Sequence, residues 1–464
     1  MRKSLSTILI FVITVGNTLS VTTNNIDSLE AQLSITTSHD KVVTLINLSE
    51  AYRNVVYNDC IKYGTQAVEL ADKLNNKSLK ALALKSLGIS SYYSGDMDIS
   101  LGYYSQSLEL YEEIDDKKGQ ASCLNNLGNI YLEWANFDKA IDYYTRSFNM
   151  EEMLDNKEGM AISLLQIGNI SFHRANFQRA LDNYYQALLI FTEIDDVGGI
   201  AYSYNSIGII FKEWNKFDKA LDYYEKAKNL YSETNNKRAL SQVLTNMGEV
   251  YSFELKDYKM ALKLYNKALH LKNSLEDVVG IALLNNHLGT LYANMENRQK
   301  ALEFFNISLK MYKESGISTG VVMVNYNIGE IYKDSDKIKK AIEFFQNSLS
   351  MAKKNGQVDY INSNYEALIH CYASLGDYDK FQKYFRLFSI GKDSLIDRLH
   401  ELELVEMEMK YKVEESILES VQLQKANENK EKELSKYKLL FAVVGGVLIL
   451  LLFSYILFLR VRKK

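Results

Sequence analysis

The strongest constraint on the fold of this chain is a pattern that returns every 40 residues. Seven glycines stand at one phase of it, with a spacing of 40 that is broken once by 41: Gly88, Gly128, Gly168, Gly208, Gly248, Gly289 and Gly329. Self-similarity at such a period is typical of architectures in which each repeat packs only on its neighbours. The chain is therefore expected to use one structural unit many times.

Three further positions recur after each glycine. A small residue follows 12 residues later, an aromatic residue 16 later and a Ser or Ala 19 later, as Ala140, Tyr144 and Ser147 follow Gly128. These offsets alternate steps of four and three, which places the residues on one stripe of a second helix. Glycine inside a helix costs about 1 kcal/mol relative to alanine. Its recurrence indicates a helix that passes too close for a β-carbon, with the small residues serving the same approach and the aromatics filling wider gaps.

These positions resemble the tetratricopeptide repeat, whose signature is Leu-Gly, then Tyr, a turn, Ala, an aromatic residue and Ala. The segment from Leu127 and Gly128 through Tyr131, Ala140 and Tyr144 carries it, and seven units repeat it in register. The period exceeds the usual repeat by six residues, so longer helices are expected. The proline that normally ends each repeat is missing, and Asp, Asn and Gly turns stand in its place. The resemblance implies a superhelical array of helix pairs.

The pattern weakens at both ends, as terminal repeats do. An eighth unit has Ile369 at the glycine position, and an earlier unit covers about 42–74, with Cys60 and Ala67 at the small positions. Residues 26–33 add a capping helix. The sequence thus predicts an all-α fold: a right-handed superhelical solenoid of about nine helix pairs over 21–390, followed by a charged helix and one transmembrane helix.

Composition supports helices and gives no reason to expect nucleic acid. The 464 residues include 33 Tyr and no Pro, and a long β protein would normally use Pro in its turns. The formal net charge is −4, which offers no basic surface for a phosphate backbone.

The N-terminus has the features of an export signal. Residues 1–20 begin with Arg2 and Lys3, continue with an apolar run from Leu5 to Val15, and end in small and polar residues. This order is typical of a secretory signal peptide. The alternative is a buried first helix.

The C-terminus has the features of a membrane anchor. Residues 439–459 contain no charged side chain and, as a helix, would span roughly 30 Å, the thickness of a bilayer core. A basic tail, 460–464, follows. With an export signal in front, this tail is expected in the cytoplasm and the repeats in the periplasm, as a single-pass cell-membrane protein. The alternative for this segment is a buried core helix.

The stretch 391–438 is highly charged and helical in composition. Leu395, Leu399, Leu402, Met409 and Val413 suggest an apolar seam. The heptad is imperfect, so a coiled coil and a solvated linker helix both remain open.

No motif for catalysis or metal binding is present. The six His lack metal-ligand spacing, and the glycines stand inside helices instead of in a phosphate-binding loop. We expect no catalytic residue, cofactor or metal, and no enzyme. Cys60, Cys123 and Cys371 fall in non-adjacent units, so they are expected to be small buried residues without a disulfide.

The family resemblance implies a partner-binding surface on the concave face. In the family this face is formed by first-helix positions three before and one, four and five after the glycine. The candidate residues at these positions are Tyr92, Asn125, Asn129, Asn169, Asn205, Lys212, Glu249, Asn286, Glu330 and Lys333. Asn amides suit an extended peptide backbone. The alternative is that these are ordinary solvated polar residues.

The overall order resembles the exported repeat region of Bacteroidetes-type membrane sensor kinases and regulators, without their output domain. This resemblance implies a membrane-anchored, periplasm-facing protein that binds a protein or peptide partner. It would be the sensory part of a split signalling system with a membrane kinase or regulator as partner. The alternative is a static scaffold for envelope protein complexes.

Overall fold

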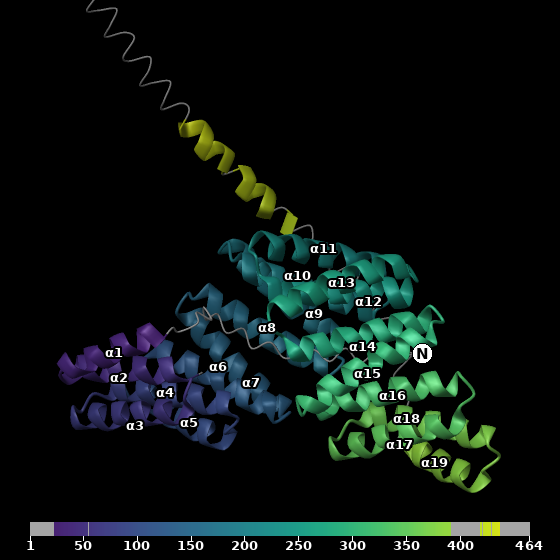
Figure 1. The fold of residues 1–464 in the computed structure, drawn as a ribbon. Coiled ribbons are helices and arrows are strands. Elements are labelled where there is room, and N and C mark those ends of the chain that lie inside the picture. Colours follow the sequence, from purple (N-terminus) through teal and green to yellow (C-terminus); the bar gives the residue numbers. More distant parts are fainter. Residues whose placement is uncertain (1–22, 54, 391–417, 420, 428, 437–464) are drawn as a thin grey trace, which may run out of the picture. The chain divides into compact units, whose positions relative to one another are not determined.

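The computed structural model describes residues 23–53, 55–390, 418–419, 421–427 and 429–436, and every regular element in this part is helical (Figure 1). The chain divides into two units, 1–393 and 394–464. In the second unit the described residues are helical. The signal peptide predicted for 1–20, the transmembrane helix for 439–459, the tail 460–464 and most of the linker 391–438 lie outside the described residues. The coiled coil stays a prediction.

The first unit consists of helices joined by short turns. In chain order these are α1 (Thr23–Ile35), α2 (Ser38–Tyr52), α3 (Tyr57–Lys73), α4 (Lys77–Ser94), α5 (Met97–Glu113), α6 (Lys117–Glu133), α7 (Phe137–Met153), α8 (Lys157–His173), α9 (Phe177–Glu193), α10 (Val197–Glu213), α11 (Phe217–Glu233), α12 (Lys237–Glu249), the π-helical turn η1 (Val250–Glu254), α13 (Tyr258–Ser274), α14 (Val278–Asn294), α15 (Arg298–Glu314), α16 (Ser318–Lys333), α17 (Ile338–Lys354), α18 (Val358–Ser374) and α19 (Tyr378–Ile390).

The helices pair in chain order, from α2 with α3 to α18 with α19, which gives nine pairs in the described residues. Even-numbered helices are the first members and odd-numbered helices the second. Each pair packs on the next, and α1 packs on α2. The predictions of an all-helical solenoid, of about nine pairs and of an N-terminal capping helix are confirmed. The right-handed superhelical course stays a prediction.

The turns have a common construction. In most of them one residue adopts a left-handed backbone, and in many the side chain of the next residue caps the following helix. Between α7 and α8, for example, Asp155 has φ 51° and the Asn156 side chain accepts from the backbone N–H of Gly159 at 3.4 Å. Asp and Asn tolerate the left-handed region and are good N-caps, which explains why these turns need no proline.

Each repeat glycine lies against the aromatic ring of its own pair. A β-carbon at Gly128 would lie 2.6 Å from the Tyr144 ring, and one at Gly208 would lie 2.7 Å from the Tyr224 ring. The same contact joins Gly88 to Tyr104, Gly168 to Tyr184, Gly248 to Tyr265, Gly289 to Phe305 and Gly329 to Phe345. The close approach is confirmed. We had expected the aromatic residues to fill wider gaps away from the glycines. That expectation is wrong, because each ring itself occupies the space that the missing β-carbon leaves.

The small positions are as close-packed as predicted. Ala140, Ala180 and Ala220 are fully buried. The serines 19 residues after the glycine add a hydrogen bond: Ser107 Oγ donates to the Ala81 carbonyl at 2.7 Å, and Ser308 Oγ to the Ala282 carbonyl at 2.7 Å. A small hydroxyl therefore fits where alanine fits and also satisfies a helix carbonyl.

A second column of glycines, nine residues before the first, was missed by the sequence analysis. Gly119, Gly199 and Gly320 lie against Tyr111, Phe191 and Tyr312 of the preceding helix. In two repeats a buried charged side chain takes the place of the ring and reaches the N-cap of the next helix. Glu151 accepts from Asn156 Nδ2 at 2.7 Å, and Lys272 Nζ lies 2.9 Å from Asp277 Oδ2.

Five repeats also carry a lysine above a stacked aromatic pair. In one of them the Tyr292 and Phe304 rings are 5.3 Å apart and 5° from parallel, and Lys300 Nζ lies 5.0 Å from the Tyr292 centroid. The other four sets are Tyr131, Tyr143 and Lys139; Phe211, Tyr223 and Lys219; Tyr332, Phe344 and Lys340; Tyr372, Tyr384 and Lys380. In the repeat with Ser171 both aromatic positions are lost, since Asn183 stands opposite it, although the cation position is kept as Arg179. Stacking and cation–π attraction thus join the two helices at the pair's turn.

The single 41-residue spacing has a structural cause. The extra residue falls between Gly248 and Ala261, and there the first helix ends in the π-helical turn η1. A π turn holds one additional residue per turn, so the downstream helix returns to phase. Tyr265 consequently still reaches Gly248.

The predicted location requires correction. We predicted a single-pass membrane protein with its repeats in the periplasm, but no helix in the described part of the chain has the length and apolar character needed to cross a bilayer. The localisation prediction is therefore wrong by this finding. That prediction relied on the segments 1–20 and 439–459, which were interpreted from their composition alone.

The glycine–ring contact makes a testable prediction. Gly208→Ala should lower the free energy of unfolding by about 1–3 kcal/mol, because its β-carbon meets a fully buried ring. Gly102→Ala is the matched control: Gly102 is inside α5 with no heavy atom within 4 Å of its β-carbon position, so the change should stabilise by about 1 kcal/mol. Urea denaturation measures both. A stabilised Gly208→Ala protein would contradict the packing argument.

Candidate functional site

The candidate site is the face formed by successive first helices, called here the first-helix face. First helices of neighbouring repeats contact one another directly, as α4 contacts α6 and α14 contacts α16. The ten predicted residues come from α4, α6, α8, α10, α12, α14 and α16. The structure therefore brings their side chains together in neighbouring pairs, and most of them have partners on this face.

Two of the predicted asparagines are hydrogen-bonded to the core tyrosines. Tyr144 Oη donates to Asn129 Oδ1 at 2.6 Å, and Tyr184 Oη donates to Asn169 Oδ1 at 2.9 Å. Asn169 Nδ2 also donates to Tyr202 Oη of the next repeat at 3.1 Å. Each amide thus satisfies a phenol that the glycine contact forces into the core.

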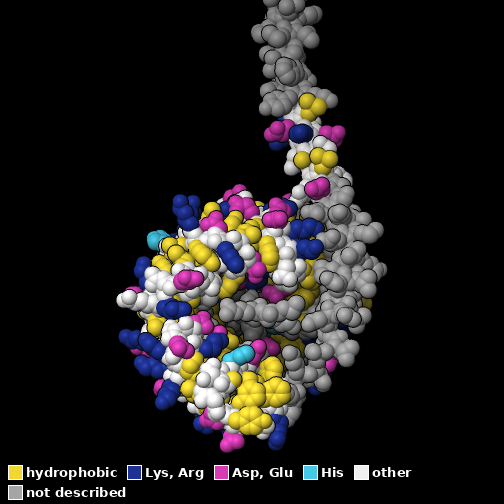
Figure 2. All heavy atoms as spheres, turned by 90° about the vertical axis from the view of Figure 1, so that its right-hand side faces the viewer, with side chains coloured by type: hydrophobic (Ala, Val, Ile, Leu, Met, Phe, Trp, Pro, Cys, Tyr) yellow, Lys and Arg dark blue, Asp and Glu magenta, His cyan; other side chains and the backbone are white. Residues whose placement is uncertain are grey.

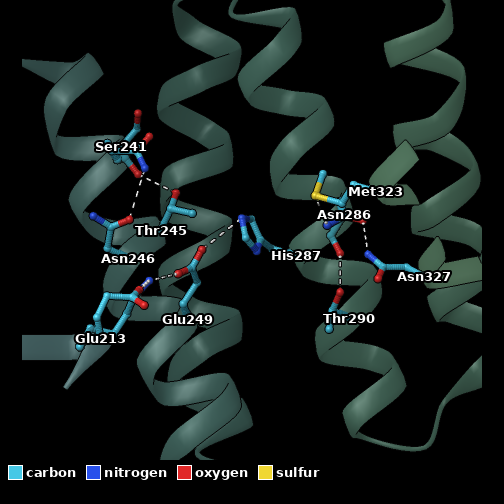
Figure 3. A network of polar contacts seen from close by, with 12 residues as sticks. Glu213, Ser241, Thr245, Asn246, Glu249, Asn286, His287, Thr290, Met323 and Asn327 are labelled. Carbon is cyan, nitrogen blue, oxygen red and sulfur yellow. Dashed lines mark hydrogen bonds and ion pairs between the residues drawn. The ribbon is translucent and has the colours of Figure 1, made fainter. Parts of the chain in front are cut away.

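Two others form amide pairs across repeats. Asn246 Nδ2 donates to Asn205 Oδ1 at 3.0 Å. Asn327 Nδ2 donates to Asn286 Oδ1 at 2.8 Å (Figure 3). Both pairs join residues 41 apart, from three before one glycine to two before the next. Asn125, at the equivalent position of α6, is half-buried.

The centre of the face carries a partly buried charged group from three repeats. Glu249 of α12 lies between Lys212 of α10 and His287 of α14. Its Oε2 is 2.8 Å from Lys212 Nζ. Its Oε1 is 3.4 Å from His287 Nε2, a contact drawn in Figure 3. We call these three residues the Lys212–Glu249–His287 group. One carboxylate therefore connects three consecutive repeats.

Burial and charge act in opposite directions on this group. Burial alone would lower the pKa of Lys212, but Glu249 and Glu213 outweigh it and hold that pKa above its ordinary value. Burial alone would raise the pKa of Glu249, but Lys212 and His287 outweigh it, so the pKa is lowered. Burial lowers the pKa of His287, with Glu249 opposing and Lys212 adding to the shift. At neutral pH the group is thus a lysine–glutamate ion pair beside a neutral imidazole.

The remaining predicted residues form contacts nearer the ends of the array. Tyr92 Oη donates to Glu133 Oε1 of the next repeat at 3.2 Å. Lys333 Nζ contacts both carboxylate oxygens of Glu330 at 2.8 Å within α16. The role of the ten residues in partner binding stays a prediction.

Near the Lys212–Glu249–His287 group, the buried Tyr224 Oη lacks a hydrogen-bond partner in the described part of the chain, whereas the buried Tyr265 hydroxyl interacts with Ser252. Burial and then the charge of Glu249 raise the pKa of Tyr224 and of Tyr265, which places both phenols near that carboxylate. In these repeats Ile209 and Glu249 replace the asparagine that serves Tyr144 and Tyr184. Unpaired buried hydroxyls are costly and mark incompletely satisfied packing.

An acidic residue also recurs where first helices end. Glu133 ends α6, Glu213 ends α10, Glu254 ends η1, and Asp334 directly follows α16. Glu133, Glu254 and Asp334 are exposed and form no ion pair with a described residue. Some second helices also end in glutamate: Glu113 pairs with Lys77 at 2.9 Å and Glu193 pairs with Lys157, whereas Glu233 at the end of α11 is exposed without an ion pair among the described residues. The negative end of the helix dipole repels an acidic side chain at the helix C-terminus, which destabilises the helix. Helix stability therefore does not explain the acids at the ends of first helices.

Sequence reasoning missed several members of this face, including His287, Asn246 and Asn327. A signal for the amides was available, because Asn205 and Asn246, like Asn286 and Asn327, stand 41 residues apart. The role of His287 could not be found this way, because its contact with Glu249 depends on how α12 and α14 pack.

The cysteines agree with the prediction: Cys60, Cys123 and Cys371 are buried and unpaired in disulfides. Burial raises the pKa of Cys123 and of Cys371 to about 11, which makes both thiols poor nucleophiles. In the described residues, no three His, Cys, Asp or Glu side chains gather as a metal site would need. The expectations of no cofactor, no metal and no catalysis stay predictions.

Comparison with known proteins identifies the repeat. The family model described as tetratricopeptide repeat matches residues 79–152, 159–233, 216–274 and 280–354, together more than half of the chain. No curated protein matches the sequence. The resemblance to Bacteroidetes-type sensor kinases is not confirmed.

Solved structures share the fold at low identity. The apo form of the quorum sensor NprR from B. thuringiensis is 14% identical with a TM-score of 0.55, over 76% of this chain and 99% of that one. A Rap protein complexed with Competence and Sporulation Factor is 14% identical with a TM-score of 0.52, over 72% and 93%. A signal transduction ATPase with a tetratricopeptide repeat sensor from Pyrococcus horikoshii is 14% identical with a TM-score of 0.50, over 72% and 50%.

The paired and unpaired tyrosines give a matched prediction. Tyr144→Phe should lower the free energy of unfolding by about 1–3 kcal/mol, because buried Asn129 loses its donor. Tyr224→Phe removes a hydroxyl that has no partner, so it should be neutral or stabilising. Chemical denaturation of both variants tests this. Equal losses at the two sites would show that the asparagine contact contributes nothing.

Proposed function

Because the chain belongs to the tetratricopeptide-repeat family, we propose that it acts by binding a protein or peptide along its first-helix face, and not by catalysis. The fold shared with a Rap protein complexed with Competence and Sporulation Factor, and with the quorum sensor NprR, supports this proposal. A sensory role with a separate signalling protein is the more specific form of the hypothesis. A static scaffold is the alternative.

The observation that carries the proposal is the row of acids at the ends of first helices. Glu133, Glu213, Glu254 and Asp334 occupy equivalent places in their repeats, so they recur along one edge of the first-helix face. Most are exposed, and local helix energetics disfavours them. Because a ligand can offset that cost, we propose a partner with basic side chains along an extended segment.

The surface as a whole does not select such a partner. The face seen in Figure 2 has acidic and basic side chains interspersed, and the formal net charge is only −4. Selectivity for a basic segment must therefore come from the local row of acids and from the amides beside it.

The test is a binding assay with random peptide pools of matched length, one enriched in Lys and Arg and one in Asp and Glu. The basic pool should bind more tightly, and its affinity should fall with added salt. The triple variant Glu133→Gln, Glu254→Gln, Asp334→Asn should bind the basic pool at least about tenfold more weakly, at roughly 0.5 kcal/mol or more per lost charge pair.

The matched control is the double variant Glu113→Gln, Glu193→Gln, which removes acids at the ends of second helices. It should bind the basic pool as the unmodified protein does. Equal binding of both pools, or an equal loss in the two variants, would overturn the choice of face and of partner.

A further inference from the structure

The Lys212–Glu249–His287 group is a joint between repeats. The three residues stand on α10, α12 and α14, the first helices of three successive pairs. Both oxygens of Glu249 are engaged, Oε2 with Lys212 at 2.8 Å and Oε1 with His287 at 3.4 Å.

The same place is where the repeat departs from its regular geometry. The π-helical turn η1 begins at Val250, directly after Glu249. Its Ser252 hydroxyl interacts with Tyr265 of α13, and the nearby Tyr224 hydroxyl of α11 is buried without a hydrogen-bond partner in the described residues. Opening an irregular helical turn beside an unsatisfied hydroxyl costs less free energy than opening a regular repeat.

His287 is largely enclosed, with one carboxylate and two lysines among the groups that act on it. Its side chain is 14% exposed. Glu249 of α12 faces it, the Tyr265 ring of α13 stacks on it at 5.6 Å and 21°, and the cations Lys212 of α10 and Lys272 of α13 act on it. Because Glu249 already pairs with Lys212, a protonated imidazole would share that carboxylate with a second cation.

We infer that this group is a proton-operated joint: protonation of His287 loosens the packing of α12 and η1 against α14 and so changes the shape of the first-helix face. Acidification therefore acts on the middle of the array, next to the acids Glu213 and Glu254. This inference rests on the proposed function for its consequence, which is regulation of partner binding by pH.

The direction follows from linkage. The folded-state pKa of His287 lies below its ordinary value, so the folded joint binds fewer protons than the open one. Its stabilisation is complete above about pH 6.5, the pKa of a free imidazole, and declines as the pH falls below that. One pH unit below that value the opening equilibrium can rise by up to about tenfold.

Amide hydrogen exchange tests the joint on the full chain without any ligand. After correction for intrinsic exchange rates, protection of α12, η1 and α14 should fall severalfold from pH 7.5 to 5.5, whereas α6 and α8 should change little. His287→Gln keeps a donor toward Glu249 but cannot take a proton in this range, so it should abolish the response. His270→Gln replaces an exposed histidine on α13 and should respond as the unmodified protein does.

An NMR titration of the unmodified protein gives a second measurement that needs no variant. The pKa of His287 should lie below 6.5, its free-imidazole value. A pKa at or above that value, or a pH response that persists in His287→Gln, would overturn the proposed joint.

Binding of the basic peptide pool is measured separately at pH 7.5 and 5.5. If no pool binds at either pH, the proposed function fails while the exchange result stands. If binding is equally pH-dependent in His287→Gln, the regulatory link fails.

Discussion

The contact on which the rest of the structure depends is the aromatic ring that lies on a glycine. Within each regular pair, the ring of the second helix occupies the space where a β-carbon of the first would be, as Tyr224 does at Gly208. This contact sets the distance between the two helices, so the small residues beside it, such as Ala220, must also be small. Because the same contact recurs at the same phase, the pairs stack in one register along the array.

That contact also determines the polar chemistry of the first-helix face. A ring pressed into the core brings its hydroxyl with it when it is tyrosine, and the hydroxyl needs an acceptor. Asn129 and Asn169 supply one to Tyr144 and Tyr184. Where Glu249 stands instead, the carboxylate pairs with Lys212 and contacts His287, and the nearby Tyr224 hydroxyl lacks a partner among the described residues. A buried charged group and an unsatisfied hydroxyl therefore lie close together on this face.

The likeness to other tetratricopeptide-repeat structures extends to the fold and no further, at 14% identity to NprR and to the Rap complex. What distinguishes this array lies in a few side chains that interrupt the pattern. The acids at first-helix ends and the π turn after Glu249 are departures from the repeat consensus, and such departures are where functional residues are expected. Two buried charges on second helices, Glu151 and Lys272, are a different kind of departure, since each reaches a helix cap.

The sequence by itself determined the helix pairs, their number and their order, because a period of 40 with glycine, alanine and aromatic residues in fixed phase permits one local packing. It also indicated which first-helix positions share a face. Tertiary structure alone decided what those positions do. Asn129 and Asn169 serve core phenols, Asn205 and Asn286 join repeats, and Glu249 contacts His287 across α12 and α14. The physical reason is that local spacing fixes the direction of a side chain along its own helix, whereas the partner it meets depends on the distance and rotation between helices.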